Sequence, residues 1–128
     1  MTRANALFTA AFLSLALLVT VSAESRADQT EDAFELNRDA MVDMSMAEFE
    51  SAAEKFIRAA DLVPDYGIKG RRLQYTPNFM AAWAFEKMGK AQNACLYFKK
   101  FLDIAPLGDR ELTKTEHAQE YVSSHCGL

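Results

Sequence analysis

Cysteine and histidine are scarce in this chain, which has two of each among 128 residues. No stretch alternates polar and apolar residues with the period of two that marks a half-buried β-strand. Glycine-rich phosphate loops, a serine elbow between a strand and a helix, and paired catalytic carboxylates are not evident either. What remains is a series of helical patterns, and we expect an all-α protein without catalytic residues.

Long apolar runs are equally scarce, because the only one lies at the N-terminus, over residues 6–21, after the basic residue Arg3. This run is short for a bilayer crossing, which takes about 20 apolar residues. Small residues close it in an A-x-A-like pattern that ends at Ala23, as in a secretory signal peptide. We expect cleavage after Ala23, or alternatively after Ala27.

Three segments follow from this pattern: a signal peptide at 1–23, a flexible acidic tail at 24–32 and a helical domain at 33–128. A chain of this length supports one domain with a modest core. We expect the mature protein in the periplasm or outside the cell, with no membrane span once the signal peptide is removed.

Basic residues are too few to balance the acidic ones, and the formal net charge is −4. Loss of Arg3 with the signal peptide would make it −5, which argues against nucleic acid and anionic membrane surfaces as partners. Residues 24–54 contain ten acidic and two basic residues, whereas residues 55–128 contain eight acidic and eleven basic ones. This asymmetry is typical of a solvated acidic face, and an acidic docking surface is the alternative.

Apolar residues recur with helical spacing in five stretches, and the expected helices cover about 33–44, 47–63, 77–88, 91–104 and 110–123. Pro64 and Pro106 end the second and the fourth, because proline lacks the backbone donor that a helix interior needs. Thr76 and Pro77 are good starting residues for the third. Before them we expect a loop with a basic patch, formed by Lys69, Arg71 and Arg72.

The apolar periodicity also predicts which residues face inward on the first and last helices. On the first helix these residues are Phe34, Ala40, Met41 and Met44. On the last helix, which Asp109 is expected to cap, they are Leu112, Thr115, Ala118, Tyr121 and Val122.

The phrases that end in the two prolines, FESAAEKFIRAADLVP and AQNACLYFKKFLDIAP, are similar to each other. When they are aligned on the prolines, Ala52 faces Ala94 and Phe56 faces Phe98. With the turn residue Gly89 before the second phrase, this pattern resembles the tetratricopeptide repeat family. The resemblance covers nearly all of the mature chain as about two repeats and a final helix, with alanine at position 47 where a turn glycine is expected.

The resemblance implies helical hairpins that bind a peptide or protein in the concave surface made by the first helix of each hairpin. The positions that match this surface are Asn37, Met41, Met44, Phe79, Trp83 and Lys87. Phe79 and Trp83 occupy the positions that the family's carboxylate clamp would need, so the groove would be apolar and would suit an apolar helix or segment. An ordinary place in the core is the alternative for Met41, Met44 and Phe79. The basic patch is expected to be a solvated loop, with a second contact to an acidic partner as its alternative.

Cys95 and Cys126 are expected to form a disulfide, because an even number of cysteines in an oxidising compartment favours pairing. Fewer than three repeats rarely stand alone, so a covalent link has a physical reason here. Straight antiparallel helices would not bring the two sulfurs together, and we expect the last helix to unwind after Val122 to close the gap. Two reduced, buried cysteines are the alternative.

His117, His125 and Cys126 are the remaining candidates for a metal or nucleophilic site. They do not share one helical face, and zinc needs four convergent ligands, or three and a water molecule. We therefore expect no metal and no cofactor, and we favour a non-catalytic protein–protein interaction module, an adaptor or scaffold of the bacterial periplasm or cell envelope. Two alternatives stay open: an envelope subunit that self-associates, and a small secreted enzyme or metal protein.

Overall fold

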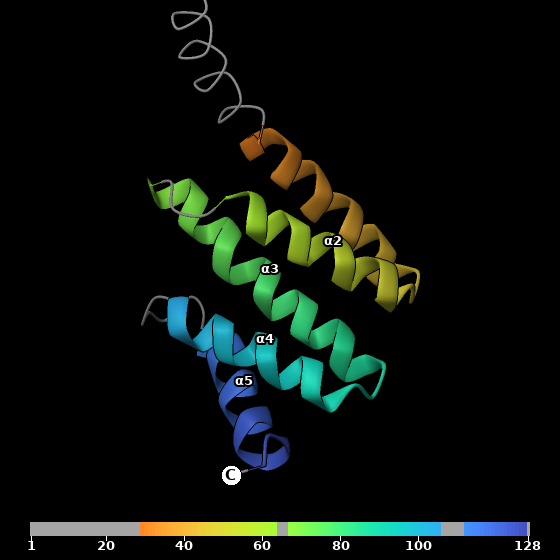
Figure 1. Ribbon diagram of the computed structural model, residues 1–128, viewed down its shortest axis with the longest axis vertical. Helices are drawn as coiled ribbons and strands as arrows, with labels where there is room; N and C mark the ends of the chain where they lie inside the picture. The colour runs from red at the N-terminus through yellow and green to blue at the C-terminus, as the bar shows by residue number, and fades with distance from the viewer. Residues whose placement is uncertain (1–28, 64–66, 106–111, 128) are drawn as a thin grey trace, which may run out of the picture.

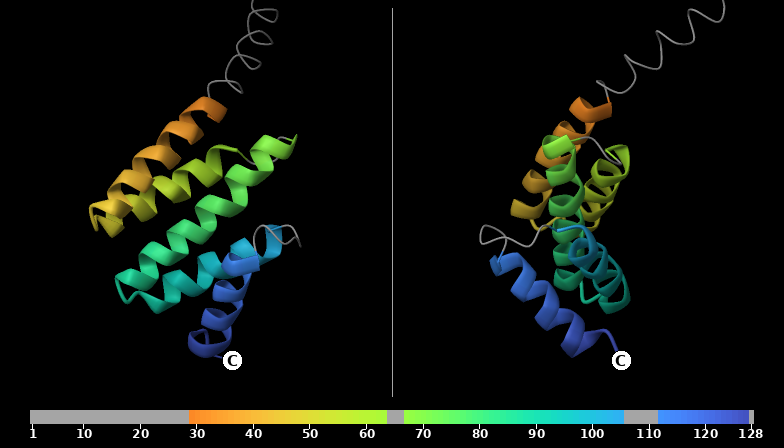
Figure 2. Two further views of the ribbon diagram at one scale, coloured as in Figure 1. Left: turned by 180° about the vertical axis from the view of Figure 1, so that it is seen from behind. Right: turned by 90° about the vertical axis from the view of Figure 1, so that its left-hand side faces the viewer.

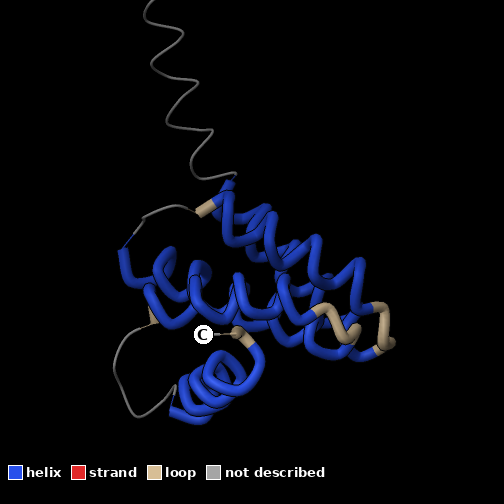
Figure 3. The backbone as a smooth tube through the Cα atoms, turned by 60° about the horizontal axis from the view of Figure 1, so that its bottom comes forward, coloured by secondary structure: helices blue, strands red, loops and turns tan. Residues whose placement is uncertain are grey.

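The computed structural model describes residues 29–63, 67–105 and 112–127. Within these ranges the chain forms five helices and no strand, and two of the connections are short turns at residues 46–48 and 88–90 (Figure 3). The first helix covers residues 29–45. The other four are α2 (Phe49–Leu62), α3 (Gly67–Lys87), α4 (Ala91–Ile104) and α5 (Leu112–His125). The all-α fold predicted from the sequence is confirmed.

The helices stack in chain order along the long axis of the molecule (Figure 1). α3 packs against both α2 and α4, and α5 packs against α4. In the right-hand view of Figure 2, α2 and α4 lie on one side of α3, and the first helix and α5 lie toward the other side. The face opposite α2 and α4 is therefore built by the first helix, α3 and α5.

One hydrophobic core joins side chains from all five helices. At its centre Phe98 contacts Phe79 and Tyr121, with ring centroids 5.6 Å and 5.0 Å apart. Ala40 and Ala52, both fully buried, let the first helix and α2 approach closely because they have no bulky side chain. Across the described part of the chain, no helix combines the length and the apolar composition that a bilayer crossing requires.

The turn between the first helix and α2 has the geometry of a Schellman cap. The N–H of Glu48 donates to the carbonyl oxygen of Asp43 (2.9 Å), and the N–H of Ala47 donates to that of Met44 (3.1 Å). Such a pair of bonds places the residue after the helix in the left-handed conformation, and Ala47 has a φ of +59°.

The turn between α3 and α4 repeats this geometry. The N–H of Lys90 donates to the carbonyl oxygen of Phe85 (2.9 Å), and the N–H of Gly89 donates to that of Glu86 (3.0 Å). Both bounds of α4 are those of α2 displaced by 42 residues. The similarity between the two phrases of the sequence therefore corresponds to two helical hairpins with the same turn.

The largest difference from the sequence-based expectation concerns α3. It begins at Gly67 and contains Pro77 inside the helix, whereas we predicted a loop up to residue 75 and a helix from Pro77. The prediction of a loop is wrong. The residues of the basic patch, Lys69, Arg71 and Arg72, lie on the first turns of α3.

Packing explains why α3 continues through its proline. Pro77 removes one backbone hydrogen bond within the helix, but its ring is fully buried. Leu73 and Tyr75 are also buried, at 6% and 7% exposure. Leu73 lies one turn before Pro77 on the same face of α3, and Tyr75 lies one turn before Phe79. The burial of these side chains outweighs the local preference for starting a helix at proline.

The first helix turns different residues inward than we expected. Phe34 and Met41 are 48% and 47% exposed, whereas Ala33 and Ala40 are fully buried. The small residues face the core because α2 and α3 pack closely against this helix. Residues 29–32, which we assigned to the acidic tail, form its first turn, and the predicted signal peptide lies outside the described residues.

α5 is helical as far as His125, so the predicted unwinding after Val122 is wrong. The helix runs back toward the start of α4, and it crosses α4 at an angle instead of lying straight alongside it (Figure 1). Its C-terminal end therefore reaches the second turn of α4 without unwinding. Leu112 is 53% exposed rather than inward, while Ala118 and Tyr121 are buried as predicted. The expected cap Asp109 lies outside the described residues.

Candidate functional site

A pocket of about 250 Å³ lies between α3 and the first half of α5. Phe79 and Trp83, one turn apart on α3, form one wall, and the other wall consists of Thr113, Lys114 and His117. Pockets for small-molecule ligands usually measure about 300–1,000 Å³. This pocket is smaller, and its aromatic wall suits one apolar side chain of a partner.

Phe79 is the buried part of the pocket wall, at 7% exposure. Its ring packs against Phe98 and Phe101 of α4, with centroids 5.6 Å and 5.1 Å away. Edge-to-face contacts of this kind fix the orientation of a ring as well as burying it. The wall is therefore preorganised by the core behind it.

Trp83 is the exposed part of the wall. It is the single tryptophan of the chain, and it is 36% exposed. Lys87, one turn further along α3, holds its Nζ 5.6 Å from the centroid of the Trp83 ring, where a cation is attracted to the electron-rich face. Lys87 thus brings a positive charge beside Trp83 and the pocket.

His117 holds the α5 wall against α3. Its Nε2 lies 2.8 Å from Oε2 of Glu86 on α3, and its ring packs against Phe79 and Phe98 with centroids 6.0 Å and 5.6 Å away. The contact is a hydrogen bond when the imidazole is neutral and an ion pair when it is protonated.

The histidines and cysteines considered for metal binding are each occupied in other contacts. His125 stacks on Tyr121, with centroids 4.4 Å apart, and Cys126 is bonded to Cys95. Among residues 29–63, 67–105 and 112–127, no group of three or more histidine, cysteine, aspartate or glutamate side chains is placed to hold a metal ion.

The predicted positions on the first helix do not line this pocket. Met44 packs partly buried against the core, and Met41 is exposed. Asn37 has a buried Oδ1 without a hydrogen-bond partner in the described part of the chain. The structure therefore brings Phe79 and Trp83 together with α5 and leaves Asn37, Met41 and Met44 on the neighbouring helix.

The α5 wall is the part of the site that sequence analysis missed. Thr113, Lys114 and His117 are spaced by one, three and four residues, so they lie on one side of the helix. This spacing is visible in the sequence. However, the side faces α3 only because α5 crosses α4 at an angle, and no local pattern encodes that crossing.

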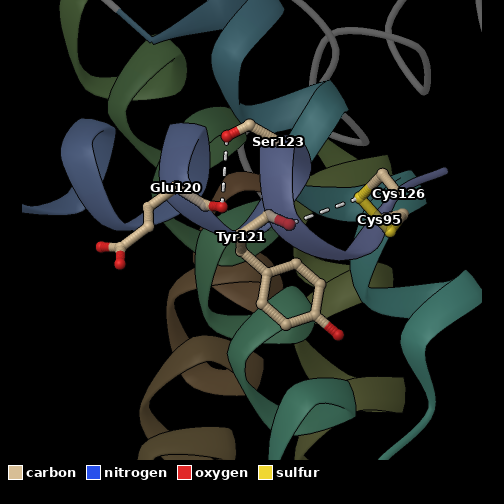
Figure 4. Close-up of a disulfide and its surroundings, with 5 residues drawn as sticks. All are labelled: Cys95, Glu120, Tyr121, Ser123 and Cys126. Atoms are coloured by element: carbon tan, nitrogen blue, oxygen red, sulfur yellow. Dashed lines mark hydrogen bonds between the residues drawn. A yellow bond between two sulfur atoms is a disulfide. The ribbon is translucent and has the colours of Figure 1, made fainter. Parts of the chain in front are cut away.

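The Cys95–Cys126 disulfide fixes the far end of α5. The two Cα atoms are 5.6 Å apart, and Figure 4 shows the bond beside the last turn of α5. Cys95 is 8% exposed within the core-facing stripe of α4. Sγ of Cys126 also lies 3.9 Å from the carbonyl oxygen of Tyr121. The predicted disulfide is present, and it links the helix that carries the pocket wall to α4.

Asp43, a carboxyl group with a lowered pKa, lies away from this pocket and has a structural role. Lys55 lies 2.8 Å from Oδ2 of Asp43, and Ser51 donates a hydrogen bond to the same oxygen (2.8 Å). The hydrogen bond from Lys55 lowers the pKa of Asp43 most, and the bond from Ser51 lowers it further. The same hydrogen bond to Asp43 raises the pKa of Lys55. These bonds fasten α2 to the end of the first helix.

A second, wider hollow of about 590 Å³ lies near the start of α2, beside Met88, and its polar rim is acidic. The acidic residues that line it are Glu48, Glu50 and Glu54. Phe49 is the one aromatic residue among its lining residues, and most of the hollow lies in the acidic part of the chain.

No protein-family model, curated protein or solved structure matches this chain.

Proposed function

We propose that this chain is a non-catalytic protein-binding module, an adaptor or scaffold, that holds an apolar side chain of its partner in the pocket between α3 and α5. The observation that carries this proposal is the exposed Trp83 above the buried Phe79 in an apolar pocket. Tryptophans that lie beside a preformed pocket are enriched among the residues that dominate binding energy. Lys87 and His117 at the sides supply polar groups that can orient the partner.

The proposed groove continues from this pocket onto the first helix. Asp43 bonds to Lys55 of α2, so the flank of the first helix that carries Asp43 faces α2. Met41 and Asn37, four residues apart, lie together on another side of the first helix, and we propose that this side continues the groove. A partner segment that fills the pocket can therefore extend along Met41, as a helix in a groove does.

The architecture that we propose for this groove is that of tetratricopeptide-type hairpins. Three observations support it: two helical hairpins with equivalent turns, alternation of the helices between two sides of α3, and a final helix after the second hairpin. The displacement of 42 residues between α2 and α4 exceeds the about 34 residues typical of that family, because α3 begins at Gly67 rather than at Pro77.

The location that we propose is the periplasm or the extracellular side of the cell envelope, after removal of residues 1–23. The apolar N-terminal run supports this location. The disulfide agrees with it, because such bonds persist mainly in oxidising compartments.

Photo-crosslinking in the native envelope tests the proposal. A photoreactive phenylalanine derivative replaces Trp83, and a matched control carries it at Leu96, which is 51% exposed on α4 outside the pocket. We expect mass spectrometry to identify a distinct protein attached at position 83 and absent at position 96. The proposal fails if position 83 yields no adduct. Adducts formed only with other copies of the chain would favour a self-associating envelope subunit.

A further inference from the structure

The pocket depends on a helix that is held loosely by its own side chains. Thr113, Lys114 and His117 of α5 form one of its walls. However, Ala118 and Tyr121 are the buried residues of α5, whereas α4 buries Ala94, Cys95, Phe98 and Phe101. The polar contact from His117 to Glu86 joins two partly exposed side chains, which are 41% and 27% accessible, and such contacts contribute little stability.

Covalent bonds hold α5 at both of its ends. At its N-terminal end the chain continues from α4, and at its C-terminal end Cys126 is bonded to Cys95. Among the described residues, the disulfide is therefore the only covalent restraint on the C-terminal end of the helix. Breaking it leaves only noncovalent contacts, among them those of Ala118, Tyr121, Val122 and His117, to hold the pocket wall in place.

We propose that the Cys95–Cys126 disulfide is a redox control of the pocket: a dithiol reductant that cleaves it releases α5 and removes the pocket wall. The control rests on the proposed function, because it regulates the same binding site. In this control the disulfide form binds the partner and the dithiol form does not.

The reaction is an ordinary thiol–disulfide exchange. A thiolate of the reductant attacks Sγ of Cys126, which is partly exposed, rather than that of Cys95, which is 8% exposed. The bond between the two protein sulfurs breaks, and Cys95 leaves as a thiolate that takes up a proton. The second thiol of the reductant then displaces Cys126 from the mixed disulfide. The protein gains two electrons and two protons as two thiols, and the dithiol becomes a disulfide.

The rest of the core can survive this change. Phe79, Phe98, Phe101 and Tyr75 come from α3 and α4, and their mutual contacts do not involve α5. The turns that join the first four helices contain no cysteine. Release is therefore expected to be local, with α5 opening while the two hairpins stay folded.

Hydrogen exchange measured by mass spectrometry tests the control on the whole chain, with and without an excess of dithiothreitol. We expect amide exchange in α5 to accelerate after reduction by about tenfold or more beyond any acceleration in α2 and α3. Acrylamide quenching of Trp83 fluorescence should increase in parallel, because the tryptophan loses the α5 wall. The double variant Cys95→Ala/Cys126→Ala should behave like the reduced protein in both conditions, which excludes an unrelated effect of the reagent.

Two results would overturn the control. Unchanged exchange in α5 would show that its side chains hold it without the disulfide. Equal acceleration in all the helices would show that the bond supports the whole domain rather than the pocket wall.

Photo-crosslinking at position 83, repeated with and without dithiothreitol, separates this inference from the proposed function. Local opening of α5 together with a partner captured at position 83 only in the disulfide form supports both. Local opening without any captured partner supports the redox control of the pocket wall and contradicts the binding function. Equal capture before and after reduction overturns the redox control and keeps the function.

Discussion

Ala47 and Gly89 occupy the same place in the two hairpin turns, and both have a positive φ, +59° and +72°. The left-handed conformation costs an alanine roughly 1–2 kcal/mol because its Cβ crowds the backbone, whereas glycine adopts it freely. The first turn therefore contains backbone strain that the second does not. The glycine that the repeat pattern favours in the turn is present in the second hairpin and replaced by alanine in the first.

Exchanging the two turn residues should change stability in opposite directions. We expect Ala47→Gly to raise the free energy of unfolding by about 0.5 kcal/mol, since the relief of strain exceeds the entropic cost of glycine in the unfolded chain. Gly89→Ala should lower it by about 1 kcal/mol. No atom lies within 4 Å of a Cβ added at Gly89, so this loss comes from the backbone. Urea denaturation measures both values, and a loss of stability in both variants would contradict the strain at Ala47.

The sequence predicts α2 and α4 well because both carry clear apolar stripes. Phe56 and Phe98 are fully buried at equivalent positions, and both helices end shortly before a proline. The start of α3 could not be predicted in this way, since the rule that favours Pro77 at a helix start is local. The burial of Leu73 depends on the other helices, and local rules do not contain it.

The pocket could be predicted only in part, for the same reason. Trp83 is one of the positions that the repeat resemblance matched to a concave surface, and it is 36% exposed beside the pocket. His117 has no such signal. Its place in the pocket follows from the angled crossing of α5 over α4, which depends on Tyr121 packing against Phe98 and on the disulfide.

Removing the disulfide should reduce the stability of the domain. The two cysteines are 31 residues apart in sequence, and closing a loop of this size contributes about 3–4 kcal/mol in the chain-entropy model. We therefore expect Cys95→Ala to lower the melting temperature measured by calorimetry. The wild-type protein should melt at a lower temperature in reductant, whereas the variant should melt equally with and without it. An equal melting temperature of the wild type with and without reductant would show that the disulfide does not stabilise the domain.

The bond between Asp43 and Lys55 predicts a pH dependence. Because the pKa of Asp43 is lower in the folded protein, its contribution to stability is present above the unfolded pKa of about 3.9 and is lost as the pH falls through the folded value. Because the pKa of Lys55 is raised, its contribution is present below the unfolded value of about 10.4 and is lost as the pH rises through the folded one. The pair should therefore contribute throughout the neutral range.

Asp43→Asn tests this dependence. We expect the variant to be less stable than the wild type at pH 7, and the difference to shrink below about pH 4 as Asp43 takes up a proton in the wild type. Lys55→Met provides the matched control, since the double variant should lose less than the sum of the two single variants. A difference between Asp43→Asn and wild type that stays constant down to pH 2 would contradict the assignment.

Asn37 offers a test that joins stability to binding. Its Oδ1 is buried and has no hydrogen-bond partner among the described residues, and such an oxygen costs about 1–3 kcal/mol. Asn37→Leu removes the oxygen with a side chain of similar size, and we expect the free energy of unfolding to rise by about 1 kcal/mol. Asn78 is the matched control: it is also buried, at 8% exposure, but takes part in an interaction, so Asn78→Leu should lower stability.

The effect of Asn37→Leu on capture at position 83 then decides what the unpaired oxygen is for. If Asn37 supplies a hydrogen bond to the partner in the proposed groove, the more stable variant should capture less of it, because the partner's donor would be buried without an acceptor. Capture at the wild-type level together with higher stability would restrict the groove to α3 and α5. A less stable variant would instead show that the oxygen is satisfied in solution, for example by a buried water molecule, and would remove Asn37 from the binding surface.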